Sequence, residues 1–403
     1  MALMPVADAL AAILAGAAPL SEEMVALDDA HHRVLARDIA ALRTQPPQAM
    51  SAMDGYAVRA ADASSVAARL KVIGEVAAGR PFDKSIAAGE SVRIFTGGVI
   101  PHGADAVIIQ EDTVADGNSI SITEAAIAGR HVRPAGVDFH AGDVLLTAGR
   151  RLTDRDLSLA AAMNYLALAI RRRPKVALFA TGDELVMPGG ALGPGQIVYS
   201  NGYALRALAR AEGAETIDLG IVADTSKATR EAIRRARDSG ADILITTGGA
   251  SVGDHDLVKP SLEAEGVEIA FWRIAMRPGK PMMHGRRDAM RVIGLPGNPV
   301  SSYVCAWLFL VPLIRALSGR PDVHHVPEPA LLGRAVAAND QRQDYLRARL
   351  EKQDDGVLVA TPVHHQDSSL LGNLAAAQAL VIRSPFAPAA SEGSACTILR
   401  LPI

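Results

Sequence analysis

Between residues 171 and 320 the chain alternates strand-like and helix-like segments, and this alternation restricts the possible folds more than any other feature. Short runs rich in valine, isoleucine and leucine are each followed by a segment with helical periodicity. The segments read PKVALFATGDEL, NGYALRALARAEGAE, TIDLGIVAD, TSKATREAIRRARDSG, DILITTGG, PSLEAEG, RVIGLPG and NPVSSYVCAWLFLVPLIRALSG. Strands separated by helices in this way pair in parallel, because each helix returns the chain to the same edge. We predict a central three-layer α/β domain with a mostly parallel sheet over 171–320.

Both flanks of this region have the pattern of β structure. From about residue 50 the runs LKVIGEV, SVRIFTGG, DAVIIQE, SISIT and DVLLTAG alternate with turn clusters. After Pro321 short β-like runs return as YLRARLE, GVLVATPV, ALVIRS and CTILRLP. A chain of 403 residues also exceeds one ordinary core. The predicted organisation is a β-rich N-terminal region over 1–170, the α/β domain over 171–320 and a C-terminal β domain or barrel over 325–403.

Charge and composition narrow the kinds of partner. The formal net charge is −3 with acids and bases interleaved, so nucleic acid and anionic membranes are not expected and small-molecule partners are. The apolar run 303–314 is too short to span a membrane and contains Pro312. The first twenty residues are predicted to form an amphipathic helix rather than a signal peptide. Cys305 and Cys396 are expected to be packing residues in a protein of the reducing cytoplasm, with a disulfide or metal site as the alternative.

Four strand ends of the predicted sheet carry unusual residues, in the runs TGDEL, VADT, TTGGASVGDHD and GLPGNPVS. The carboxyl ends of parallel strands meet at one edge, and ligands bind there. In the third run, Gly248, Gly249 and Gly253 allow backbone N–H groups to face an anion. Asp254 and Asp256 in the same loop would repel one, which makes the loop look contradictory.

A divalent cation removes this contradiction. Carboxylates bind a hard cation such as Mg²⁺, which in turn bridges phosphate oxygens. We therefore predict that Glu184, Asp224 and Asp256 form one acidic shell for Mg²⁺. The competing interpretation is that Asp254 or Asp256 only caps the following helix.

Two other loops complete the predicted edge. MRPGKP sets Arg277 and Lys280 around a proline–glycine turn, which suits an oxyanion or a phosphate, with a solvated surface turn as the alternative. In GLPGNPVS, Pro296 and Pro299 restrict the backbone and Asn298 is expected to cap the next helix.

The N-terminal half contains two isolated candidates. Asp54 lies in a DGY turn and Thr96 precedes two glycines. Local evidence favours ordinary turn chemistry for both.

Taken together, several long runs in the correct order resemble the molybdopterin molybdotransferases, the MoeA family, to which the C-terminal region of gephyrin is related. The runs are SAMDGYAVRAAD, RIFTGGVIPHGADAVIIQEDT, VRPAGVDFHAGDVLL, LFATGDEL, GQIVYSNGYAL, TTGGASVGDHD, MRPGKP and GLPGNPVSS. The resemblance spans about 50–305 and is looser in the last 80 residues.

This resemblance implies four structural units and an elongated homodimer. The units are a β-rich region, a small α/β unit inserted at about 45–137, an α/β domain of the molybdopterin-binding type and a C-terminal β-barrel-like domain. The cleft would combine the α/β domain of one subunit with the inserted unit of the other. Asp54 and Thr96 would then meet their partners across the interface.

The implied reaction takes adenylylated molybdopterin and molybdate, places the metal on the dithiolene sulfurs and releases AMP, with Mg²⁺ required. The implied catalytic residues are Asp54, Thr96, Asp138, Glu184, Asp224, Asp256 and Lys280. The implied substrate-binding residues are Gly248, Gly249, Ser251, Gly253, Arg277, Pro296, Pro299 and Ser368.

The sequence departs from the family pattern in two places. Arg277 stands where lysine is common, and Asp254 stands where some relatives have glutamate. Two other functions stay open: a molybdopterin adenylyltransferase, which is also the expected pathway partner, and a non-catalytic gephyrin-like scaffold. The adenylyltransferase would need only the α/β unit, and a scaffold would not need an acidic shell.

Overall fold

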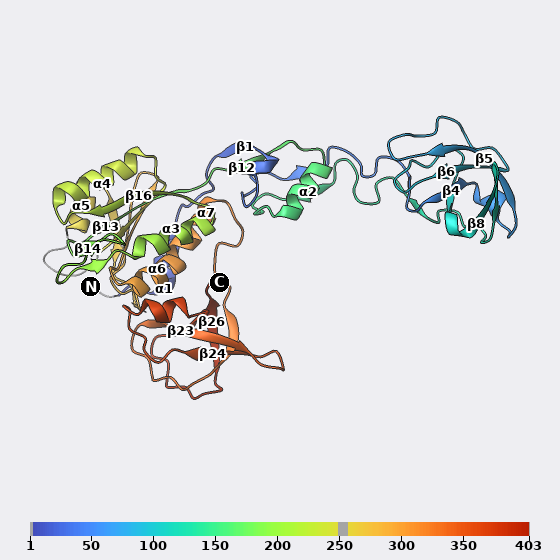
Figure 1. Cartoon of the computed structure of the whole chain (residues 1–403). Coiled ribbons are helices and arrows are strands. Elements are labelled where there is room, and N and C mark those ends of the chain that lie inside the picture. The colour runs from blue at the N-terminus through green and yellow to red at the C-terminus, as the bar shows by residue number, and fades with distance from the viewer. Residues whose placement is uncertain (1–2, 249–256, 403) are drawn as a thin grey trace.

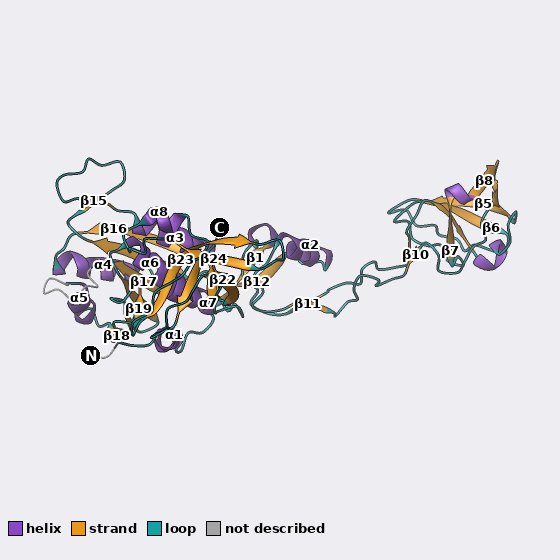
Figure 2. Ribbon diagram, turned by 90° about the horizontal axis from the view of Figure 1, so that it is seen from below, coloured by secondary structure: helices purple, strands orange, loops and turns teal. Residues whose placement is uncertain are grey.

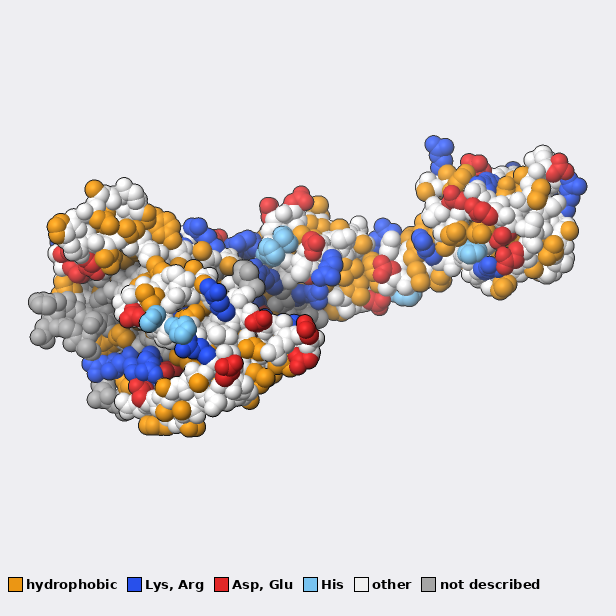
Figure 3. Space-filling view, turned by 60° about the horizontal axis from the view of Figure 1, so that its bottom comes forward, with side chains coloured by type: hydrophobic (Ala, Val, Ile, Leu, Met, Phe, Trp, Pro, Cys, Tyr) orange, Lys and Arg blue, Asp and Glu red, His pale blue; other side chains and the backbone are white. Residues whose placement is uncertain are grey.

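The computed structural model describes residues 3–248 and 257–402. The molecule is elongated (Figure 1), with the α/β domain and the C-terminal domain at one end, a small middle unit, and a distal β lobe at the other end. On the face shown in Figure 3, acidic and basic side chains are interspersed along the length of the molecule.

The central domain is built on a six-stranded sheet in the order β16-β13-β17-β21-β20-β18. Its strands are β13 (Lys175–Thr181), β16 (Glu215–Val222), β17 (Ile243–Thr247), β18 (Glu268–Trp272), β20 (Met283–Arg287) and β21 (Met290–Leu295). The first four strands in the sheet order are parallel, and β20 and β18 are antiparallel to their neighbours. Register pairs Ala180 with Thr247 and Thr247 with Leu295, so the carboxyl ends of β13, β17 and β21 lie side by side.

Helices cover both faces of this sheet, as Figures 1 and 2 show. One face carries α1 (Val6–Leu14), α3 (Asn201–Ala211), α6 (Pro299–Cys305) and α7 (Val311–Leu317), and the other carries α4 (Ser226–Asp238) and α5 (Val258–Ala264). In α4 the buried Thr229, Ala232, Ile233 and Ala236 repeat at helical spacing, and the Thr225 hydroxyl caps the helix by accepting from the Ala228 N–H. Full burial of one such isoleucine contributes about 1.5–3 kcal/mol. The predicted three-layer architecture is confirmed.

The predicted N-terminal helix is α1, and it packs into the core of the central domain although it precedes the β-rich region in sequence. Ala9 and Ile13 form its buried face. Cys305 is buried in the same core, as predicted, while Cys396 is half-buried in the C-terminal domain, and both thiols are free.

The long helix predicted from the segment NPVSSYVCAWLFLVPLIRALSG is present. α6, a π-helical segment η4 (Ala306–Leu310) and α7 run together from Pro299 to Leu317, straight through Pro312. By length and composition alone this helix could cross a membrane, but 83% of its apolar window is buried inside the domain. This is the pattern of a core helix.

The middle unit and the distal lobe are made of short strands. The middle unit contains β1 (Glu22–Ala26), β2 (Ile39–Ala40), β11 (Val144–Leu146), β12 (Ala167–Arg171) and α2 (Asp154–Ala162), whose N-terminus has a Thr153–Asp156 capping box. The pair β3 (Met50–Ser51) and β10 (Val132–Arg133) lies where the chain enters and leaves the lobe. The lobe sheet has the order β7-β4-β6-β5-β9-β8. Its strands are β4 (Gly55–Val58), β5 (Arg69–Val76), β6 (Glu90–Ile94), β7 (Ala106–Ile109), β8 (Thr113–Asp116) and β9 (Ser119–Ile122).

The lobe differs from the expected inserted unit in one respect. All residues of 45–137 are described, and none forms an α-helix; only two short 3₁₀ turns occur, at Ala60–Ala63 and Gln110–Asp112. Segments of three or four residues are too short for α-helix nucleation, so the expected α/β unit is a β unit.

The C-terminal domain is a closed five-stranded barrel, as the β-barrel-like prediction requires. Its strands are β22 (Glu328–Leu332), β23 (Gln343–Lys352), β24 (Leu358–Pro362), β25 (Ala379–Arg383) and β26 (Ala395–Arg400), with α8 (Leu371–Ala375) between β24 and β25. Pairing of β23 with both β24 and β25 closes the sheet. A strand from the central domain, β19 (Met276–Arg277), adds to β23.

Candidate active site

A cavity of about 590 Å³ lies at the carboxyl edge of the central sheet. Its wall is formed by the ends of β13, β17 and β21, the short strands β14 (Leu185–Val186) and β15 (Ile197–Val198), and the start of α6. The predicted residues that line it are Glu184, Gly248, Pro296 and Pro299. Residues that were not singled out also line it, among them Thr181, Tyr199, Asn201 and Ser369. Parallel pairing of the strands therefore brings loops far apart in sequence to one cavity.

Gly248 is required by geometry at the end of β17. Its φ is +84°, and a Cβ there would lie 2.4 Å from the Thr181 carbonyl oxygen. Gly297 approaches from the other side, with its Cβ position 3.8 Å from the Gly248 Cα. The glycine thus allows three backbone segments to meet at the cavity floor. The predicted neighbours Gly249, Ser251, Gly253, Asp254 and Asp256 lie outside the described residues, and their roles stay predictions.

The acidic residues of two strand ends form one electrostatic cluster. Partial burial raises the pKa of Asp224 above its ordinary value, and the nearby Asp183 and Glu184 carboxylates raise it further. The Asp224 N–H donates to the Asp183 Oδ1 at 3.3 Å. Asp183 was missed by the sequence interpretation, although it is adjacent to Glu184 in the TGDEL run. Within 3–248 and 257–402 no three His, Cys, Asp or Glu side chains are arranged to hold a metal ion, so the Mg²⁺ shell stays a prediction.

Replacing Asp183 with asparagine is expected to lower the pKa of Asp224, because one of the two neighbouring negative charges disappears. The pKa of Asp224 is higher in the folded state than in the unfolded state, so ionisation of this carboxyl group opposes folding. The folded state therefore loses stability as the pH rises from the unfolded-state pKa to the folded-state pKa of Asp224. Asp183→Asn makes that loss smaller. Carboxyl carbon NMR titration measures the shift, with Asp238→Asn on the exposed end of α4 as control. An unchanged pKa of Asp224 in Asp183→Asn would show that the Asp183 charge does not contribute to the rise.

Lys280 lies on an anchored loop beside the cavity. Its side chain is exposed, and the next residue, Pro281, lines the cavity. The Lys280 carbonyl accepts from the N–H groups of Ile274 and Met282, at 3.0 and 3.1 Å. A Cβ at Gly279, whose φ is +115°, would lie 2.4 Å from the Cys305 sulfur, so the loop packs directly on the core. Lys280 therefore presents its ammonium group from a fixed backbone.

Arg277, three residues earlier, already has partners. Its guanidinium donates to the Asp344 carboxylate and to the Asn339 side-chain oxygen, the latter at 3.2 Å. Asp340 lies 3.7 Å away. The predicted contact of Arg277 with an oxyanion stays a prediction.

The start of α6 joins the cavity to the C-terminal domain. Asn298 occupies the cap position, but its side chain makes no capping hydrogen bond, so that prediction was wrong. Its Nδ2 instead donates to the Ser368 hydroxyl at 2.9 Å, and the Ser368 carbonyl accepts from the Val300 N–H at 3.0 Å. A side-chain hydrogen bond to a serine 70 residues away takes the place of the local cap. No local sequence pattern predicts such a bond. The structure thus places Ser368 at the cavity rim.

Asp54 and Thr96 lie in the distal lobe and bind each other. The Asp54 Oδ1 accepts from the Thr96 N–H and hydroxyl, both at 2.7 Å, and these bonds lower the pKa of Asp54. Asp138 is exposed where the lobe joins the middle unit, and its N–H donates to the Gln45 carbonyl. Figure 1 shows that the lobe is at the far end of the chain from the central domain. A single chain does not bring these three residues to the cavity.

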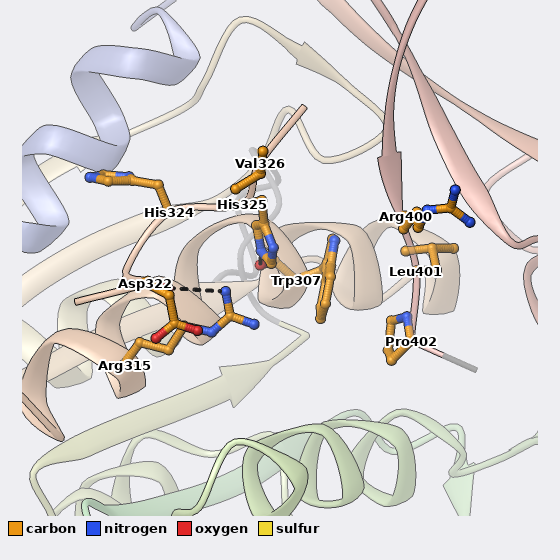
Figure 4. Close-up of a pocket in the computed structure, with 9 residues that line it drawn as sticks. All are labelled: Trp307, Arg315, Asp322, His324, His325, Val326, Arg400, Leu401 and Pro402. Atoms are coloured by element: carbon orange, nitrogen blue, oxygen red, sulfur yellow. Dashed lines mark hydrogen bonds between the residues drawn. The ribbon is translucent and has the colours of Figure 1, made fainter. Parts of the chain in front are cut away.

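A second cavity, of about 310 Å³, lies beside the long helix (Figure 4). His325 stacks on Trp307 with ring centroids 4.1 Å apart, and its Nε2 bonds the Trp307 carbonyl at 2.6 Å. That carbonyl lacks a helical partner because Val311 donates to Ala306 and Pro312 has no N–H. The cavity arginines, Arg315 and Arg400, are paired with Glu212 and Glu328. This cavity therefore has a structural explanation, and none of the strand ends of the central sheet lines it.

Comparison with known proteins agrees with this architecture. Residues 4–164 match the MoeA N-terminal region (domains I and II), residues 177–316 a probable molybdopterin binding domain, and residues 329–401 the MoeA C-terminal region (domain IV). A solved structure of a molybdopterin biosynthesis MoeA protein from Pyrococcus horikosii superposes with a TM-score of 0.86 at 31% identity, covering 99% of both chains. A second, from Pyrococcus horikoshii OT3, gives 0.83 at 26% identity, covering 99% of this chain and 100% of that one.

Curated relatives extend the similarity along nearly the whole chain. The molybdopterin molybdenumtransferase of Nostoc is 37% identical, covering 94% of this chain and 89% of that protein. The protein of the same name from Bacillus subtilis is 36% identical, covering 89% and 85%. With this identity over this length, and with all three domain matches in order, the chain belongs to the MoeA family of molybdopterin molybdenumtransferases.

Proposed function

We propose that this chain inserts molybdate into adenylylated molybdopterin, releases AMP and requires Mg²⁺. Family membership places the chain in molybdenum cofactor biosynthesis. The observation that supports the detailed reaction is the cavity itself, which is lined by Glu184 of the acidic cluster, by Pro281 next to Lys280, and by Ser369 next to Ser368. We expect this reaction in the cytoplasm, with the molybdopterin adenylyltransferase supplying the substrate.

The charged and uncharged residues of the site would serve different parts of the substrate. Lys280 would attract and orient the molybdate oxyanion, because its ammonium group is a compact positive charge carried by a backbone that two hydrogen bonds fix beside the cavity. Gly248 allows the substrate to approach the backbone closely, and Pro296 and Pro299 restrict the opposite wall. Asn298 places an amide group and Ser368 places a hydroxyl group at the cavity rim.

The acidic cluster fits a divalent cation. Burial raises the pKa of Asp224, and the negative charges of Asp183 and Glu184 raise it further; a bound cation would offset this negative charge. Glu184, Asp224 and the predicted Asp256 would hold Mg²⁺ through oxygen ligands, as Mg²⁺ prefers. When bound, the cation supplies charge neutralisation and polarisation of the pyrophosphate.

We further propose that the active form is a homodimer with a shared site. Asp54, Thr96 and Asp138 lie at the other end of the chain from Lys280 and Glu184. The Asp54–Thr96 pair is exposed, so a second subunit can contact it. A twofold arrangement would bring each distal lobe to the partner's cavity.

Mixing two inactive variants is expected to restore activity if the site is shared. Asp54→Ala inactivates the lobe side and Lys280→Met inactivates the cavity side. In a mixed dimer one of the two sites is wild type on both sides, so an equimolar mixture regains about a quarter of wild-type activity after subunit exchange. The control mixes the Asp54→Ala variant with the double variant that carries Asp54→Ala and Glu184→Gln. Every distal lobe in that mixture lacks Asp54, so no dimer has an intact site. No gain over the separate variants would contradict the shared site.

The reaction itself is tested with purified protein, adenylylated molybdopterin, molybdate and Mg²⁺. AMP release together with reconstitution of a molybdenum enzyme supports the proposal. Formation of adenylylated molybdopterin from ATP and molybdopterin would identify an adenylyltransferase instead. Absence of both activities in a folded dimer would indicate a scaffold.

A further inference from the structure

The lysine loop belongs structurally to two domains. Arg277 in β19 precedes the loop and pairs in parallel with Asp344 of β23, a strand of the C-terminal barrel. The Gln343 N–H donates to the Ala275 carbonyl at 2.8 Å, which continues this connection. A displacement of β23 would therefore move the segment that carries Lys280.

The side chain of Arg277 also joins this segment of the central domain to the C-terminal barrel. It reaches the Asp344 carboxylate, the Asn339 amide oxygen and, more distantly, Asp340. Asn339 is itself fixed, because its Nδ2 donates to the Arg342 and Ser384 carbonyls at 2.7 and 2.9 Å. The guanidinium thus binds a preformed arrangement on the barrel.

Asp344 depends on this arginine. Its side chain is 5% exposed, and its Oδ1 has no hydrogen-bond partner in the described part of the chain. Burial raises the pKa of Asp344, while the Arg277 guanidinium opposes that rise. Removing Arg277 leaves the buried Asp344 carboxylate without its cation, which is strongly unfavourable, and removing the Asp344 charge takes away the ion pair that ties the guanidinium to β23.

The loop between Arg277 and Lys280 is too short to absorb such a change. Only Pro278 and Gly279 separate the two residues, and Pro278 has a fixed φ. The Lys280 carbonyl is bonded on both sides, to Ile274 and Met282. The position of Arg277 is therefore transmitted to the Lys280 backbone.

We propose that Arg277, with Asp344 and Asn339, is an interdomain latch that positions Lys280 at the cavity, and that Arg277 does not itself contact the oxyanion. The role of Lys280 rests on the proposed function, whereas the latch can be tested without it. A lysine at this position could not form the same two-sided contact, because an ammonium group lacks the planar fork of arginine.

Hydrogen–deuterium exchange on the full-length protein tests the latch independently of catalysis. The variants are Arg277→Met, Asp344→Asn, the double variant and the milder Asn339→Ala. Exchange over 274–283 is expected to rise roughly tenfold in either single variant and no further in the double variant. The matched control is Arg400→Met, which removes an arginine of equal exposure, 48% against 47%, from an ion pair with Glu328 in the same barrel. The control should leave exchange over 274–283 unchanged.

Kinetics then separates positioning from oxyanion contact. A latch predicts that Arg277→Met and Asp344→Asn lower kcat by a similar factor and that their effects are not additive. Arg277→Lys should restore less than the full rate. The latch would be overturned by wild-type exchange over 274–283 in both single variants. It would also be overturned if Arg277→Met raised KM for molybdate while Asp344→Asn behaved as wild type. If wild-type protein shows no insertion activity, the proposed function fails while the exchange result still decides the latch.

Discussion

Lys280→Met is expected to lower molybdate insertion by about 10²–10³-fold, because a fixed cation that stabilises developing charge is removed. Methionine keeps the length and apolar stem of lysine. Folding should be little affected, since the Lys280 side chain is exposed and the structural bonds of this residue are made by its carbonyl. The measurement is AMP release as a function of molybdate concentration, with thermal unfolding recorded in parallel.

The control for this prediction is Lys352→Met, which removes an exposed lysine at the opposite end of β23 from β19. It should leave both kcat and KM for molybdate at wild-type values. Wild-type insertion by Lys280→Met would show that the lysine loop does not serve the oxyanion, and the cavity would need another cation.

Gly248→Ala is expected to destabilise the central domain by several kcal/mol and to abolish activity. A positive φ costs about 1–2 kcal/mol for alanine. The new Cβ would also lie 2.4 Å from the Thr181 carbonyl oxygen, and backbone cannot move aside as a flexible side chain can. Separation of β13 from β17 would open the cavity floor. Urea unfolding followed by tryptophan fluorescence measures the effect, because both tryptophans, Trp272 and Trp307, lie in this domain.

Gly240→Ala separates the two causes. Gly240 has a similar φ of +71° but nothing within 4 Å of its Cβ position. It should therefore show only the cost of the backbone conformation and keep its activity. Equal destabilisation by the two substitutions would mean that the close approach at Gly248 relaxes without cost.

In the central domain, local sequence patterns predicted both the sheet and the place where several candidate residues gather. Alternating strand and helix segments predicted the parallel sheet, and the rule that ligands bind at carboxyl strand ends predicted where Glu184, Gly248, Pro296 and Pro299 gather. These inferences succeeded because periodicity and glycine conformation are properties of neighbouring residues. The same reasoning passed over Asp183, whose importance appears only through its contact with Asp224.

Contacts between distant segments were not predictable in this way. The capping role expected for Asn298 was replaced by a bond to Ser368 of another domain. The helix 299–317 continues through Pro312 because a π-helical segment and His325 accommodate the missing donor. In both cases a partner remote in sequence satisfies a group that local rules would satisfy nearby.

The sequence by itself determined the α/β core, the β-rich flanks, the family and the acidic and glycine-rich residue types that follow the strands of the central sheet. Only the tertiary structure decided which of these residues meet. It closed the C-terminal barrel, joined β19 to β23 so that Arg277 binds Asp344, and placed Asp54 and Thr96 at the far end of the chain from Lys280. The physical reason is that hydrogen bonds, ion pairs and packing act over a few ångströms in space, whatever the separation along the chain.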